Sequence, residues 1–144
     1  MLMNLFLGLS TMGLCLLFQS LIFVKAIHYY TRRDYLVSNS SFVASLVVVN
    51  AVMLLLVIGN LVQIAIWAAL FLFLEDFQRF DAAFYHSAVN FSTLGYGDVV
   101  MSEPYRLLGP LESINGVLMI GISTAALTAA FRDAITKTLQ ARRG

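Results

Sequence analysis

Charged residues are scarce in this chain of 144 residues: nine are Lys or Arg and eight are Asp or Glu, 12% in all, whereas an ordinary soluble domain has about 25%. Cysteine is nearly absent, because Cys15 stands alone and forms neither a disulfide framework nor a thiolate metal cluster. The formal net charge is only +1, which indicates no nucleic acid partner. Hydrophobic residues make up 60% of the chain, which excludes a disordered chain and disfavours a soluble enzyme.

Three long segments contain no charged residue. They are residues 1–24, 42–74 and 113–131, with 24, 33 and 19 residues. About 20 helical residues cross a bilayer core that is about 30 Å thick. We therefore expect an all-α membrane protein with three transmembrane helices, over residues 1–24, 42–74 and 110–131. The first is expected to be a retained helix rather than a cleaved signal, because its basic residues follow the apolar run.

The distribution of charge predicts the orientation in the cell membrane. Three of the nine basic residues lie in residues 25–41 and four lie after residue 131, whereas six of the eight acidic residues lie in residues 75–112. Cytoplasmic loops of membrane proteins are enriched in Lys and Arg. We therefore expect a cytoplasmic loop over residues 25–41, a cytoplasmic tail over residues 132–144, and an N-terminus outside.

Local signals mark the ends and the interiors of these helices. Residues 38–41 offer N-caps for the second helix. Pro110 is expected at the first position of the third helix and Glu112 in its first turn, where an acidic side chain suits the helix dipole. Four amide side chains within the first two spans are expected to link helices by hydrogen bonds: Gln19, Asn50, Asn60 and Gln63.

The stretch between the second and third spans contains a segment too short to cross a membrane. Residues 81–92, DAAFYHSAVNFS, would form about 18 Å of helix at about 1.5 Å per residue. Because both flanks are expected outside, a helix that enters partway and an extended strand that returns fit this stretch.

The returning strand, TLGYG at residues 93–97, has glycine at alternate positions. Glycine enters left-handed conformations at little cost, and a backbone that alternates in handedness directs successive carbonyl oxygens to one side. One chain provides one wall of such a ladder, so several copies must surround an axis before the carbonyls replace the hydration shell of an ion.

The segment TLGYGD, residues 93–98, resembles the selectivity filter of the potassium channel family, whose usual form is TVGYG. The resemblance covers residues 71–131 and implies a pore domain over residues 42–131, with residues 81–92 as the pore helix. It also implies a homotetramer in membrane lipid that conducts K⁺ passively, with no cofactor and no organic substrate. The implied K⁺ ligands are the Thr93 hydroxyl and the backbone carbonyls of Thr93, Leu94, Gly95 and Tyr96.

The resemblance carries further expectations for residues around the filter. Leu94 stands where valine is commonest, so a non-selective cation channel stays an alternative to a K⁺-selective one. Tyr85 matches an aromatic residue that hydrogen-bonds the aspartate after the filter, here Asp98, and so holds Gly97 at the outer mouth; the alternative is a place in an interfacial aromatic belt. Val89 stands where some bacterial members carry a glutamate paired with that aspartate.

The inner helix resembles that of the family in its small residues. Gly116 and Gly121 are candidate bends, although at Gly116 the alternative is close helix packing. Helical spacing places Ile122, Ala125 and Ala129 on a candidate cavity and gate face.

The gating stimulus is left open by the sequence. No span carries arginines at every third position, so a voltage sensor is not expected. His86 is a candidate pH sensor near the outer mouth, because imidazole titrates near neutrality, and an ordinary hydrogen-bonded histidine is the alternative. Glu112 is a second candidate for pH sensing.

Two other classes of protein compete with the channel interpretation. GYGD also matches the GxGD motif of intramembrane aspartyl proteases, but these enzymes need two facing aspartates within the membrane, and the three charge-free spans contain none. The other is a channel-like subunit that assembles with other pores without conducting alone, which its failure to form a homotetramer would reveal.

Overall fold

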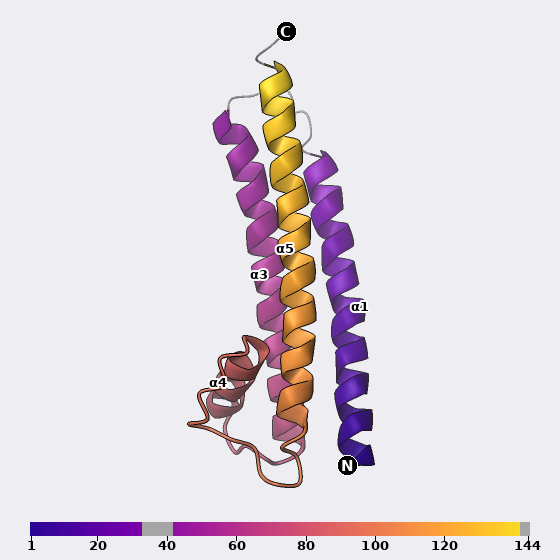
Figure 1. The fold of residues 1–144 in the computed structure, drawn as a ribbon, viewed down its shortest axis with the longest axis vertical. Coiled ribbons are helices and arrows are strands. Elements are labelled where there is room, and N and C mark those ends of the chain that lie inside the picture. Colours follow the sequence, from indigo (N-terminus) through magenta and orange to yellow (C-terminus); the bar gives the residue numbers. More distant parts are fainter. Residues whose placement is uncertain (33–41, 142–144) are drawn as a thin grey trace. The chain divides into compact units, whose positions relative to one another are not determined.

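The computed structural model describes residues 1–32 and 42–141. This part of the chain contains four helices and no strand, namely α1 (Leu2–Arg32), α3 (Phe42–Phe73), α4 (Phe80–Phe91) and α5 (Leu108–Ala141) (Figure 1). Three segments are long and apolar enough to cross a membrane: Leu2–Arg32, Ser45–Phe73 and Leu108–Gln140. The expected all-α architecture with three spans is confirmed, whereas the caps expected at residues 38–41 lie outside the described residues.

Two of the long helices run further than the charge-free segments predict. α1 continues past residue 24 to Arg32, and α5 continues past residue 131 to Ala141. The described parts of the expected loop 25–41 and tail 132–144 are therefore helical up to those residues. A charged residue ends an apolar run without ending a helix, because Lys and Arg are good helix formers and can extend their charge into water.

The start of α5 also differs from the prediction. The helix begins at Leu108, and Pro110 stands within the first turn rather than at the first position. A proline is tolerated there because the first N–H groups of a helix have no intrahelical partner. The first turn of α5 contains no acidic residue, so the prediction that Glu112 lies in that turn is wrong.

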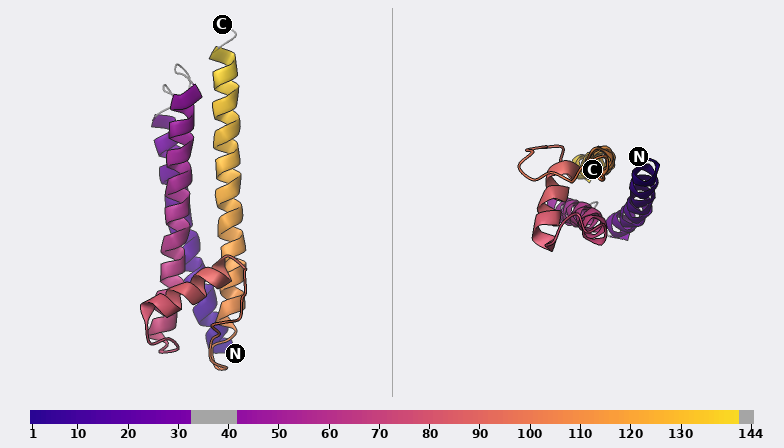
Figure 2. Two further views of the ribbon diagram at one scale, coloured as in Figure 1. Left: turned by 90° about the vertical axis from the view of Figure 1, so that its left-hand side faces the viewer. Right: turned by 90° about the horizontal axis from the view of Figure 1, so that it is seen from below.

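Two compact units divide the chain. The first comprises Met1–Gln19 and Asn60–Ile120, and the second comprises Ser20–Gly59 and Gly121–Gly144. In the first unit, α4 lies across the adjoining parts of α3 and α5 (Figure 2). The core of the first unit is formed by buried residues of α1, α3, α4, the loop before α5 and the start of α5: Cys15, Trp67, Ala68, Phe71, Ala83, Met101 and Leu108.

The first part of α1 is built into the first unit. Asn4 Nδ2 donates to the Pro104 carbonyl at 2.6 Å. Gln63 Nε2 donates to Gln19 Oε1 at 2.6 Å and links α3 to α1 as predicted. Asn50 donates to the Leu46 carbonyl of its own helix at 2.9 Å, and a link from Asn50 to another helix stays a prediction.

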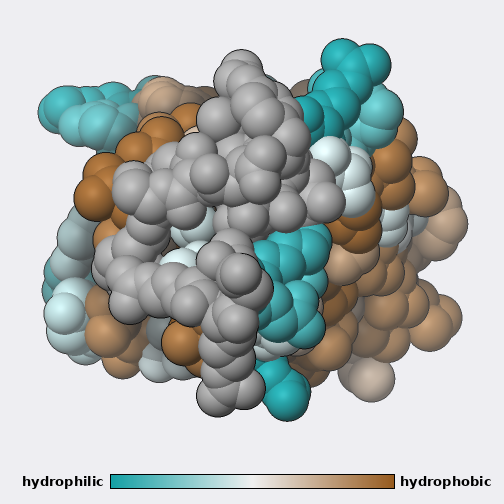
Figure 3. Space-filling model, turned by 90° about the horizontal axis from the view of Figure 1, so that it is seen from above, coloured by the Kyte–Doolittle hydropathy of each residue, from teal (hydrophilic) through white to brown (hydrophobic). Residues whose placement is uncertain are grey.

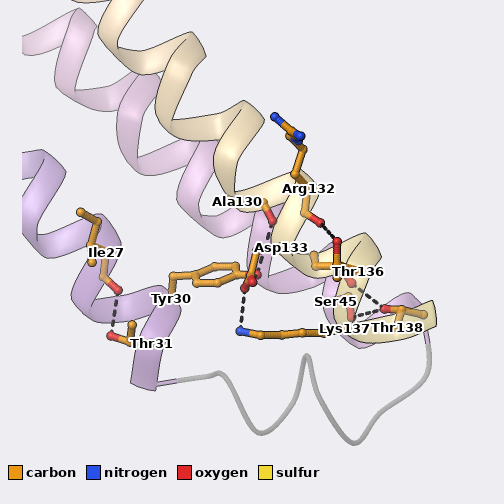
Figure 4. Close-up of polar contacts among 11 residues, drawn as sticks. Ile27, Tyr30, Thr31, Ser45, Ala130, Arg132, Asp133, Thr136, Lys137 and Thr138 are labelled. Atoms are coloured by element: carbon orange, nitrogen blue, oxygen red, sulfur yellow. Dashed lines mark hydrogen bonds and ion pairs between the residues drawn. The ribbon is translucent and has the colours of Figure 1, made fainter. Parts of the chain in front are cut away.

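In the second unit, α3 packs against the later parts of α1 and α5 through Val48, Val49, Val52, Leu56, Ala26 and Ala134. At its end, Tyr30 Oη donates to Asp133 at 2.9 Å, and Asp133 pairs with Lys137 at 2.6 Å (Figure 4). Viewed from the C-terminal end, hydrophilic residues lie at several separate places beside hydrophobic ones (Figure 3).

Candidate selectivity filter

The filter segment follows directly from the C-terminus of α4. α4 ends at Phe91, next to the end predicted for the pore helix 81–92. The backbone N–H of Thr93 donates to the Asn90 carbonyl at 2.9 Å, and that of Leu94 donates to the Val89 carbonyl at 3.0 Å. The first residues of the filter therefore cap carbonyl groups that the end of a helix leaves without partners.

The backbone of the filter alternates in handedness. φ is +61° at Thr93, +58° at Gly95 and +72° at Gly97, and neither intervening residue has a positive φ. Glycine adopts this conformation freely, whereas a side chain makes it cost about 1–2 kcal/mol. The alternation at Gly95 and Gly97 is readable from the sequence. The third left-handed position, Thr93, has no such signal, because nothing about a threonine marks it.

The side chains of the filter are left uncovered by the chain itself. Leu94 is 57% exposed and Tyr96 65%, and Val100, three residues after the filter, is 71% exposed. A Cβ atom added to Gly95 or Gly97 would meet nothing within 4 Å. The left-handed glycines are therefore required by the backbone and not by crowding, and the apolar side chains beside them need a cover that this chain does not supply.

Tyr85 lies where it can hold the residue after the filter. Its hydroxyl donates to Asp98 Oδ2 at 2.7 Å, and Asp98 Oδ1 accepts the N–H of Val99 at 3.0 Å. The hydrogen bond from Tyr85 lowers the pKa of Asp98 below its usual range and raises the pKa of Tyr85. Val89 is buried and carries no charge, so Tyr85 is the α4 side chain that bonds Asp98.

His86 makes a second link from α4 to the segment after the filter. It is buried, with Nδ1 at 2.9 Å from the Val99 carbonyl and Nε2 at 2.9 Å from Asn90 Nδ2. These partners suit a neutral ring that donates from Nδ1 and accepts at Nε2. Burial lowers the pKa of His86 below its ordinary value, which favours the same neutral form. The geometry is that of a hydrogen-bonded structural histidine.

The two glycines singled out on the inner helix have different surroundings. A Cβ atom on Gly116 would lie 2.0 Å from the Phe91 carbonyl oxygen, so this glycine permits close packing of α5 on α4. Gly121 has nothing within 4 Å of such an atom. Ile122, Ala125 and Ala129 are all exposed within the chain, and their place on a gate stays a prediction.

Glu112 is the residue of this region that the sequence placed wrongly. Its side chain is 0% exposed, and Oε1 contacts the Ser87 hydroxyl of α4. Ser87 was not a candidate, because a small polar residue in a short apolar helix gives no signal of its partner. The sequence feature that could have indicated a special role for Glu112 is its position directly before the charge-free residues 113–131.

The sequence matches the Ion channel family over residues 16–133, more than half of its length, and the chain therefore belongs to that family. It is a multi-pass membrane protein and not an enzyme. The protease alternative falls with this result, and Asp98 is in any case an exposed residue bonded to Tyr85. No curated protein and no solved structure matches the chain.

Proposed function

We propose that this chain forms a homotetrameric, K⁺-selective channel of the cell membrane. The observation that carries the proposal is the alternation of backbone handedness at Thr93, Gly95 and Gly97 within a TLGYG segment. Such a backbone directs its carbonyls to one side, where rings of them from several copies replace the water around a cation. The K⁺ ligands are the carbonyls of Thr93, Leu94, Gly95 and Tyr96 and the Thr93 hydroxyl.

Assembly of several copies is supported by what one chain leaves unfinished. The exposed side chains of Leu94 and Tyr96 need neighbours, and a single ladder cannot enclose an ion. The C-terminus of α4 carries the negative end of the helix dipole, which favours a cation near the start of the filter. With the C-terminus in the cytoplasm and the N-terminus outside, as the charge distribution predicts, the filter faces the outer side.

The test is reconstitution of the purified protein into liposomes with opposed K⁺ and Na⁺ gradients. We expect a reversal potential close to that of K⁺. A reversal potential that ignores K⁺ would establish the non-selective alternative and refute selectivity. If no current flows and the protein is not a homotetramer, the chain is a subunit that does not conduct alone.

A further inference from the structure

A carboxyl group lies buried behind α4. Glu112 belongs to the span Leu108–Gln140, yet its side chain is 0% exposed. Its Oε2 has no hydrogen-bond partner, and no Lys or Arg pairs with it, among the residues that the structure describes. Because a single chain already encloses this carboxyl group completely, a neighbouring copy has no access to it.

Within residues 1–32 and 42–141, no charged side chain lies beside Glu112 to compensate the charge of a carboxylate. The Cys15 thiol on α1 is a titratable group that faces Glu112 directly. His86 on α4 is linked to Glu112 through Asn90, which lies beside Glu112 and is hydrogen-bonded to His86. α3 contributes none, because Phe42–Phe73 contains no charged residue, and α5 has no other charged residue before Arg132. An ionised carboxylate without a cation is costly inside a membrane protein, whereas the protonated acid is not.

The contacts of Ser87 give a second, geometric reason for a protonated acid. Ser87 Oγ lies 2.8 Å from the Ile64 carbonyl oxygen of α3 and also contacts Glu112 Oε1. A hydroxyl group has one hydrogen, and a carbonyl oxygen only accepts. If Ser87 donates to Ile64, its contact with Glu112 is a hydrogen bond only when the carboxyl group brings the second hydrogen.

We propose that Glu112 is a neutral, proton-carrying acid that donates to Ser87 and acts as a positioning residue for the filter. It joins the inner helix α5 to α4, and Ser87 passes the link to α3. The proposal rests on the proposed function, because α4 is the helix from which the filter extends.

Further contacts carry this link from α5 towards the filter. The Ser113 hydroxyl, next to Glu112, donates to the Asn90 carbonyl at 2.9 Å. The Asn90 amide lies 2.9 Å from His86, which contacts the carbonyl of Val99 beyond the filter. The segments on both sides of the filter are thus held from the helix face that Glu112 contacts.

Infrared difference spectroscopy tests the protonation without any K⁺ flux. Purified protein in lipid at neutral pH should have the carbonyl stretching band of a protonated carboxylic acid, and Glu112→Gln should remove it. Failure to lose such a band would overturn the proposal while leaving the channel function untouched.

Flux through reconstituted variants tests the positioning role. Glu112→Gln keeps a donor of the same shape and should retain K⁺ flux and selectivity. Glu112→Leu leaves Ser87 without its partner. The loss of one buried hydrogen bond corresponds to a change of about tenfold in an equilibrium constant, so the flux should fall about tenfold. Equal losses in both variants, with tetramers intact, would overturn the proposal, as would full activity of Glu112→Leu.

The pH profile separates this role from simple packing. Flux through the wild-type protein should fall once the pH is raised far enough to ionise Glu112, and Glu112→Gln should lack that fall. Cys15→Ala is the matched control, because Cys15 is the other titratable side chain that faces Glu112 directly, and this variant should keep the wild-type profile. A profile that follows Cys15 instead of Glu112 would contradict the proposal.

Discussion

At Gly95 the backbone alone decides what residue is tolerated. φ is +58° and the space around a Cβ atom is open, so Gly95→Val should strain the filter by about 1–3 kcal/mol. We expect this variant to lose K⁺ flux in liposomes. Leu94→Val is the matched control, since Leu94 has no positive φ and an exposed side chain, and it should conduct. Unchanged flux in Gly95→Val would reject the filter assignment.

Gly116 and Gly121 make a matched pair on one helix. Gly116→Ala places a methyl group against the Phe91 carbonyl, and overpacking of this kind costs about 1–3 kcal/mol. Gly121→Ala meets no neighbour and should gain up to about 1 kcal/mol of helix propensity. The thermal unfolding temperature in detergent should therefore fall for Gly116→Ala and rise for Gly121→Ala. Equal shifts would contradict the assignment of Gly116 to close packing.

The elements show how far local patterns carry a prediction. The three spans, the short helix α4 and the left-handed glycines of the filter follow from charge-free runs, segment length and glycine spacing, all of which are local. The ends of α1 and α5 do not follow, because an apolar run reports contact with lipid and not the limits of a helix. The burial of Glu112 against Ser87 joins residues far apart in the sequence, and no local pattern specifies such a contact.

The link between α4 and the segment after the filter depends on Tyr85. In the wild-type protein, the hydrogen bond from Tyr85 keeps the pKa of the Asp98 carboxyl group below its usual value. Tyr85→Phe removes this hydrogen bond. Because the pKa of Asp98 is lowered in the folded state, its charged form stabilises the structure at pH values above its ordinary pKa, near 3.9. The structure loses this stabilisation as the pH falls through the folded-state pKa. The acid limb of K⁺ flux should therefore move to higher pH in Tyr85→Phe.

Tyr105→Phe is the control for this experiment, because the Tyr105 hydroxyl has no hydrogen-bond partner in the described part of the chain. It should keep the wild-type acid limb. The same shift in both variants would count against a specific role for Tyr85.

His86 makes the stability of the folded protein depend on pH in the acidic range. Burial lowers its pKa, so the unfolded chain binds the proton more readily than the folded one. Stability from this residue is then complete above the ordinary value near 6.5 and falls as pH drops from there towards the folded-state value. Unfolding followed by the fluorescence of Trp67, the only tryptophan, should occur at lower temperature in that range.

His86→Phe should remove this dependence, whereas His28→Gln should keep it, because His28 is exposed and lies outside the first unit. A dependence that survives in His86→Phe would show that another group is responsible.

For the whole molecule, most of the apolar surface remains to be covered by something else. Only 17%, 33% and 22% of the most apolar stretches of the three spans are buried within the chain. Lipid covers such surface readily, but it cannot satisfy the carbonyls of a filter. We expect native mass spectrometry from mild detergent to give four copies of the chain. A stable monomer would contradict the proposed pore.

Residues 1–19 are part of the first unit, so they belong to the smallest fragment of this channel that could be transferred to another protein. Asn4 fastens these residues to the loop before α5, and Cys15 packs with Trp67 and Phe71 in the core. A truncation that kept only two spans would bare this core and free that loop. Anyone transplanting the pore into another protein would have to carry three helices along, not two.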